Sequence, residues 1–173
     1  MLGTVYGLVK QIIMIRFHSH SGIYSLEVKQ FINISLEEAW GFFSSPANLA
    51  KITPQHMGFE ITSGSPTKMY AGQIITYKVS PFLGVKTNWV TEITHVSEGH
   101  YFVDEQRFGP YRMWHHEHHF EVQGNGVLMT DRVSHKLPFG FLGRMAHSLF
   151  VKNQLKQIFS FREACLNLAF EQD

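Results

Sequence analysis

The sequence predicts an α+β domain in which a curved antiparallel sheet of about seven strands wraps around one long C-terminal helix. Three observations predict this class. Several segments alternate apolar and polar residues with a period of two, a Gly-Asn-Gly turn joins the last two of them, and the final stretch has apolar residues at helical spacing. The length of 173 residues suits a single domain.

The first elements are one strand and two short helices. The strand is expected to begin at Ile23, because apolar and polar residues alternate from there. Ser35 and Glu38 have the spacing of a capping box, which predicts a helix that starts after Ser35 and stops at Pro46. A second short helix is expected over residues 47–52.

The rest of the chain is expected to form strands and then one helix. The strands are expected at 59–62, 73–79, 87–95, 101–108, 113–122 and 127–137. Glycine and asparagine in the turn at 124–126 tolerate positive φ, which favours a hairpin. From Leu142 to about Phe170, an apolar stripe recurs at helical spacing. Its members are Leu142, Met145, Leu149, Leu155, Ile158, Phe159, Arg162, Leu166 and Ala169.

The composition favours a large core or a lined cavity and excludes several classes of protein. Aromatic residues make up 14% of the chain, and charged residues only 17%. The net charge of +1 predicts no nucleic-acid partner, because phosphate binding needs a clustered basic excess. No stretch approaches the ~20 apolar residues of a membrane span, so no stable membrane insertion is expected. The single Cys165 cannot form an internal disulfide, and a cytoplasmic location is expected.

The first 22 residues are expected to form an extension outside the domain, which would then cover residues 23–173. This stretch is apolar, but Lys10 and Arg16 lie within and after its most apolar run. A signal peptide carries its charges first and ends in a small-residue cleavage site, so the stretch does not fit one.

Several local motifs are distinctive in combination. They are Phe31 with Ile34, 38–43, 48–54, 89–93, 102–106, 109–120, 130–133 and 137–140. Together they resemble the START-like (SRPBCC) superfamily, and within it the bacterial ligand-binding, polyketide cyclase/dehydrase-like subfamily. The resemblance covers the chain from about Ile23 and implies a helix-grip fold with an internal cavity for an apolar or amphipathic ligand. That subfamily has no agreed catalytic residues, so the resemblance assigns none here.

Histidines are concentrated in the strand expected over 113–122. Successive side chains of a strand point to opposite faces, so Trp114, His116, His118 and Phe120 are expected to share a face toward the core or cavity. The residues between them are more polar and are expected to face solvent.

Three interpretations of His116 and His118 stay open. They are buried side chains satisfied by hydrogen bonds, contacts to a polar group of a ligand, or two ligands of a metal. Zinc needs at least a third protein ligand, which Asp131 or His135 on the next strand could supply. The first interpretation is favoured, so neither a metal nor a cofactor is expected.

Asp131 and Arg132 are expected to lie opposite His118 and His119 across the hairpin. A carboxylate beside an imidazole fixes its tautomer and raises its pKa, as for a general base, although an ordinary cross-strand pair has the same geometry. Glu92 is expected either as a buried carboxylate facing the pocket or as a surface residue.

The expected function is the binding or carriage of a small apolar or aromatic ligand in the cavity. The candidate ligand-binding residues are Trp40, Tyr77, Trp89, Phe102, Phe108, Trp114, His116, His118, Asp131 and Arg132. One alternative is a cyclase/dehydrase-like enzyme that uses a His/Asp pair to move protons on a bound polyketone-like substrate. Another is an interaction protein with a filled core.

Overall fold

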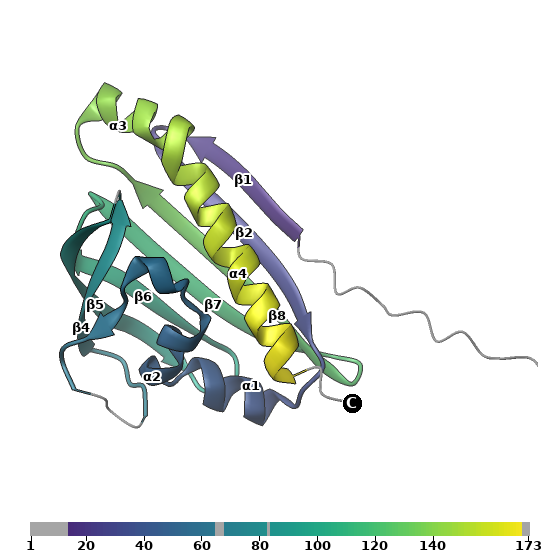
Figure 1. The fold of residues 1–173 in the computed structure, drawn as a ribbon. Coiled ribbons are helices and arrows are strands. Elements are labelled where there is room, and N and C mark those ends of the chain that lie inside the picture. The colour runs from purple at the N-terminus through teal and green to yellow at the C-terminus, as the bar shows by residue number, and fades with distance from the viewer. Residues whose placement is uncertain (1–13, 65–67, 83, 171–173) are drawn as a thin grey trace, which may run out of the picture.

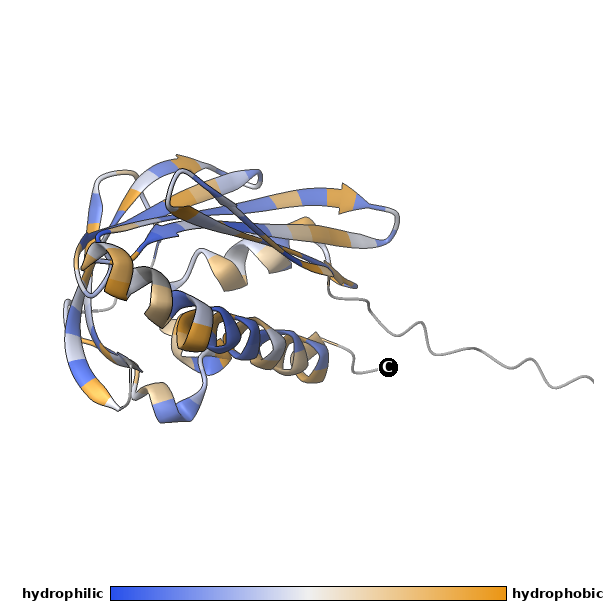
Figure 2. Ribbon diagram, turned by 90° about the horizontal axis from the view of Figure 1, so that it is seen from above, coloured by the Kyte–Doolittle hydropathy of each residue, from blue (hydrophilic) through white to orange (hydrophobic). Residues whose placement is uncertain are grey.

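An eight-stranded antiparallel sheet and a long C-terminal helix dominate the computed structural model, which describes residues 14–64, 68–82 and 84–170 (Figure 1). The strand order is β1-β2-β8-β7-β6-β5-β4-β3. The sheet forms one curved layer, and the helix lies along its inner side (Figure 2). This confirms the expected α+β, helix-grip class, with eight strands where about seven were expected.

The elements follow the expected order. The strands are β1 (Met14–His20), β2 (Ile23–Ile32), β3 (Glu60–Ile61), β4 (Gln73–Phe82), β5 (Val85–Ser97), β6 (Tyr101–Phe108), β7 (Met113–Gln123) and β8 (Gly126–Lys136). The helices are α1 (Leu36–Phe43), α2 (Pro46–Leu49), the 3-10 turns η1 (Ala50–Ile52) and η2 (Gln55–Met57), α3 (Gly140–Ala146), the π-helical turn η3 (His147–Val151) and α4 (Lys152–Phe170).

Strand β1 belongs to the stretch that was expected to lie outside the domain. It pairs with β2 along its whole length and extends the edge of the sheet. Ile15 and Phe17 alternate with exposed residues and pack against the core, which is why this segment forms a strand. Residues 1–13 lie outside the described residues, and the boundary before Ile23 stays a prediction for them.

The capping box at the start of α1 is present as expected. The backbone N–H of Glu38 donates to Ser35 Oγ at 3.2 Å, and the backbone N–H of Ser35 donates to Glu38 Oε2 at 3.0 Å. These bonds satisfy two donors that a helix start leaves unpaired. They fix the beginning of a short helix whose far end, at Phe42 and Phe43, reaches the cavity described below.

The C-terminal helix departs from its expected pattern at η3. Across the π-helical turn and into α4, buried positions recur every four residues. These positions are His147, Val151, Leu155 and Phe159. Leu142, Met145 and Leu149, which were expected in the apolar stripe, are exposed instead. Within α4 the expected stripe is confirmed, because Leu155, Phe159, Arg162 and Leu166 are buried.

Two clusters of buried side chains form the core. One contains Phe43 and Ile93, the other contains Trp89 and Phe159, and the half-buried Tyr77 packs against both. Within the described part of the chain, no helix is both long and apolar enough to cross a membrane.

Candidate functional site

A cavity of ≈ 180 Å³ lies between the inner face of the sheet and the helices. Strands β4 to β7 provide one wall, and α4 together with the segment from α1 to η1 provides the other. Most lining side chains are apolar or aromatic, so the expected filled-core alternative does not fit this part of the molecule.

Six of the ten candidate residues line this cavity. They are Tyr77, Trp89, Phe102, Trp114, His116 and His118. Strand alternation explains the set, since each of these side chains points inward from its own strand. The rings pack as one aromatic wall in which Trp89 lies 5.9 Å from Tyr77 and 5.4 Å from Trp114 between ring centroids.

The other four candidates lie outside the cavity lining. Asp131 is buried on β8 behind the two histidines. Trp40 packs edge-on against Phe102 and Phe120 in the core. Phe108 is 71% exposed, because the pairing of β5 with β6 shifts register just before it. Arg132 follows Asp131 directly and so points to the outer face.

The pairing of β7 with β8 confirms one expected contact and corrects another. His118 lies opposite Asp131, as expected. Arg132 lies opposite Glu117, and Thr130 takes the place opposite His119. In an antiparallel pair one strand advances as the other recedes, so Asp131 and Arg132 cannot follow His118 and His119 in the same order.

Five polar residues form an inner cluster at the cavity: the half-buried Asp104 and the buried His116, His118, Asp131 and Arg162. His116 Nε2 donates to Asp131 Oδ1 at 2.9 Å, and His118 Nε2 donates to Asp104 Oδ2 at 2.9 Å. Arg162, from α4, donates through Nη1 to Asp131 Oδ1 at 3.1 Å. The cluster thus ties three strands of the sheet to the C-terminal helix.

Burial and mutual charge shift the pKa values of this cluster in different directions. Burial, together with the charge of His118, lowers the pKa of His116. Burial also opposes the charged form of His118, but its bond to Asp104 and its proximity to Asp131 outweigh this and raise its pKa. Burial would raise the pKa of Asp131, yet the charge of Arg162 and the two histidines hold it well below the usual range.

The sequence analysis missed two members of the inner cluster, Asp104 and Arg162. Asp104 shares a face with Phe102, two residues earlier on β6, and this alternation was a usable signal. Arg162 stood inside the apolar stripe of the final helix, where a charged side chain has to find a buried partner.

Two hydrogen-bond donors at the cavity have no partner among the described residues. They are Arg162 Nε and Trp89 Nε1, both completely buried on residues that line the cavity. A buried donor without a partner costs about 1–3 kcal/mol. Tyr77 differs, because its hydroxyl bonds Thr91 Oγ1 at 2.9 Å and burial, with the charge of Asp104, raises its pKa.

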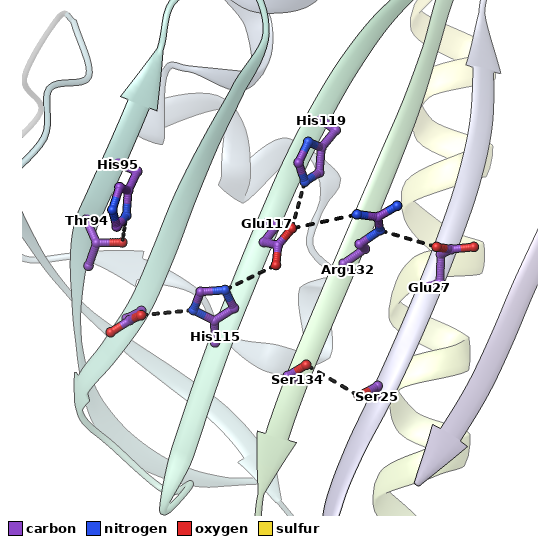
Figure 3. A network of polar contacts seen from close by, with 10 residues as sticks. Ser25, Glu27, Thr94, His95, His115, Glu117, His119, Arg132 and Ser134 are labelled. Atoms are coloured by element: carbon purple, nitrogen blue, oxygen red, sulfur yellow. Dashed lines mark hydrogen bonds and ion pairs between the residues drawn. The ribbon is translucent and has the colours of Figure 1, made fainter. Parts of the chain in front are cut away.

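The outer face of the same strands carries a separate charged network (Figure 3). Glu117 lies between His115 and His119, with contacts of 3.3 and 2.7 Å, and Arg132 bonds Glu27 at 3.3 Å. The interleaved polar residues of β7 therefore face outward, as expected. Glu92 also lies on this side, where it bonds Arg107, which decides between its two expected positions.

His135 is expected to make the protein less stable in mild acid. It is completely buried, neither ring nitrogen has a partner among the described residues, and the groups that face it are Tyr24, Tyr111, Trp114 and His147. Burial and the charge of His147 lower the pKa of His135 from 6.5 to about 4. Burial and the nearby Lys152 also lower the pKa of His147.

The stability falls in acid because the unfolded chain binds a proton at this histidine near pH 6.5. The folded protein binds it only at a lower pH. Stability is complete above pH 6.5 and falls as the pH drops toward 4, by about 3 kcal/mol from His135. Urea unfolding at pH 7 and pH 4 measures how much of the free energy of unfolding is lost in acid. This loss should be smaller in His135→Phe than in the wild type, whereas His119→Gln is expected to lose as much as the wild type. Equal losses in the wild type and His135→Phe would contradict the assignment.

No family model matches the sequence, and no curated protein matches it. Solved structures are similar across most of the chain. Protein Ms6760 from Mycobacterium smegmatis has a TM-score of 0.65 at 15% identity and covers 91% of this chain and 99% of its own. Ara h 8.0201 has a TM-score of 0.56 at 14% identity, with coverages of 84% and 98%.

A third similar structure is part of a longer protein. The nucleoside-diphosphate sugar epimerase from Corynebacterium glutamicum has a TM-score of 0.57 at 22% identity, and the match covers 81% of this chain but 28% of the epimerase. At these identities the similarities show the fold alone. They agree with the helix-grip architecture and leave the expected subfamily as a prediction.

Proposed function

We propose that the protein binds and carries a small ring-containing molecule that has one oxygen-bearing polar end. The observation that carries this proposal is the cavity itself, a partly open space with aromatic walls. Among the described residues that line it, Trp89 Nε1 and Arg162 Nε are buried donors without a partner. Ligand sites in proteins typically combine mostly apolar walls with a few placed polar groups.

The size of the cavity limits the ligand. In another protein, an apolar cavity of ~150 Å³ holds one benzene molecule. A space of ≈ 180 Å³ therefore suits a single substituted ring. The alternative function, proton transfer on a polyketone-like substrate, needs room for a longer molecule, so the volume favours binding of a small ligand.

The expected affinity is modest. One ring buries on the order of 150 Å² of apolar surface, which at ~25 cal/mol per Å² gives roughly 4 kcal/mol. A hydrogen bond from Arg162 or Trp89 would add about 1 kcal/mol. The dissociation constant is then expected between about 0.1 and 1 mM, a range that ligand-detected NMR measures well.

The test uses two substitutions on adjacent residues of β4. Ile75 is buried and lines the cavity, whereas Ile74 is 49% exposed on the other face. Ile75→Trp fills the cavity and is expected to abolish binding of p-cresol and of toluene, and Ile74→Trp is expected to bind both like the wild type. The polar group should make p-cresol bind about fivefold more tightly than toluene.

Circular dichroism establishes that both variants fold. Binding that is the same in Ile75→Trp and Ile74→Trp would contradict the proposal, as would the failure of the wild type to bind either compound.

We include a cytoplasmic location in the proposal, supported by the single free thiol at Cys165.

A further inference from the structure

We propose that Asp104, His116 and His118 form a binding site for one divalent first-row transition-metal ion at the cavity wall, with Asp131 as the residue that positions both histidines. The sequence analysis considered only Asp131 or His135, on the next strand, as a third ligand and favoured histidines satisfied by hydrogen bonds. The structure brings one from β6, the strand on the other side of β7 from the one considered. This inference goes beyond the proposed function, since the ion can be detected without any organic ligand.

The donor atoms are already close together. Asp104 Oδ2 lies 2.9 Å from His118 Nε2 and 3.4 Å from His116 Nδ1. One donor atom from each of the three residues fits within 4.8 Å of the others. Ligand atoms about 2.1 Å from a tetrahedral zinc ion are separated by about 3.4 Å, so only small movements are needed to admit the ion.

Asp131 is placed as an outer carboxylate of a metal site. Its Oδ1 accepts a hydrogen bond from His116 Nε2 and also lies 2.9 Å from His118 Nδ1. Histidines that bind metals usually donate their other ring N–H to a carboxylate or carbonyl, which fixes the tautomer. Here the nitrogens near Asp131 are the ones that do not face Asp104. An ion would therefore replace the proton that His118 Nε2 donates to Asp104, and His118 would carry its proton on Nδ1, toward Asp131.

The fixed charges of the inner cluster favour a cation. Two carboxylates, the buried Asp131 and the half-buried Asp104, face a single guanidinium at Arg162, so with both histidines neutral the cluster carries one excess negative charge. Buried charge is costly unless it is paired. A divalent ion bound to neutral histidines would turn this excess into one positive charge, which an anionic oxygen of a bound molecule would balance.

The donor set indicates the kind of ion and the kind of ligand. Two imidazoles and one carboxylate suit zinc, iron(II) or cobalt(II) better than magnesium or calcium, which prefer oxygen donors. Three protein ligands leave at least one coordination position open. All three residues line the cavity. A carboxylate or phenolate group of the ligand would fit this position.

Cobalt(II) titration of tag-free, chelator-treated protein tests the site. We expect one equivalent of Co²⁺ to bind and to give the visible absorption bands of a four- or five-coordinate ion, which one equivalent of Zn²⁺ then abolishes. Asp104→Asn and His118→Gln should lose these bands. Asp131→Asn should keep the stoichiometry and bind about 10- to 100-fold more weakly.

The outer face of β7 supplies the matched control. His115, Glu117 and His119 lie close together there and could hold an ion adventitiously. The double variant His115→Gln/His119→Gln is expected to bind Co²⁺ like the wild type. Loss of binding in this variant, or unchanged binding in Asp104→Asn, would overturn the proposal.

A second measurement on the wild type does not depend on how the variants fold. Paramagnetic Co²⁺ should strongly shift the ring NMR signals of His116 and His118 and affect those of His115 and His119 much less. The reverse pattern, or the absence of stoichiometric binding, would overturn the metal site. Binding of p-cresol to metal-free protein is measured separately, so the two proposals can fail independently.

Discussion

Replacing Arg162 by methionine is expected to destabilise the protein by about 3–5 kcal/mol, because it leaves a buried carboxylate without its cation. The Arg162 side chain is only 8% exposed, and Nη1 lies 3.1 Å from Asp131 Oδ1. Methionine has a similar length and keeps much of the packing of α4 against the sheet. The loss would therefore report chiefly on the charge that Asp131 faces.

Urea unfolding of metal-free protein, followed by circular dichroism, measures this loss. Lys156→Met is the control, because Lys156 is exposed on the same helix and its replacement is expected to change stability by less than about 0.5 kcal/mol. The double variant Arg162→Met/Asp131→Asn should recover part of the stability, since it removes both charges. An Arg162→Met protein as stable as Lys156→Met would show that the buried ion pair is not formed.

Replacing Phe102 by alanine is expected to lower the free energy of unfolding by about 3–5 kcal/mol, since it removes a buried ring at the cavity. Phe102 is 4% exposed, and its ring stacks on His118 with centroids 4.1 Å apart. It also meets the edge of Trp40. The substitution therefore removes packing from the core and joins the space of the lost ring to the cavity.

A ring compound should then restore part of the lost stability. We expect toluene to raise the melting temperature of Phe102→Ala more than that of the wild type, because the ligand binds only the folded state and the enlarged cavity holds it better. Phe108→Ala is the matched control on the same strand, where the side chain is 71% exposed and little change is expected. Equal stabilities of Phe102→Ala and Phe108→Ala would contradict the placement of the cavity.

Local patterns in the sequence were sufficient to predict most of the fold. The capping box at Ser35 fixed the start of α1, and strand alternation correctly divided the side chains of β7 between the two faces of the sheet. What failed depended on small irregularities. The register shift before Phe108 exposed a residue expected in the cavity, and the segment before α4 exposes Leu142, Met145 and Leu149, which were expected in the apolar stripe.

The candidate site was predictable only where its partners lie close in the sequence. His118 and Asp131 face each other across a hairpin whose turn the sequence marks, so their pairing followed from the position of that turn. Asp104 and Arg162 come from elements whose neighbours are set by the topology of the whole sheet and the phase of a long helix. Periodicity within a segment gives the face of a side chain and does not give the segment that packs against it.

Native mass spectrometry of tag-free protein, before and after denaturation, tests most directly whether the cavity binds a small molecule. We predict that the wild type carries one small molecule, either as purified or after incubation with p-cresol, and that denaturation releases it. The same treatment of Ile75→Trp, in which a new side chain occupies the cavity, should give the mass of the chain alone. A bound mass that persists in Ile75→Trp, or a wild type that carries nothing under either condition, would contradict the account.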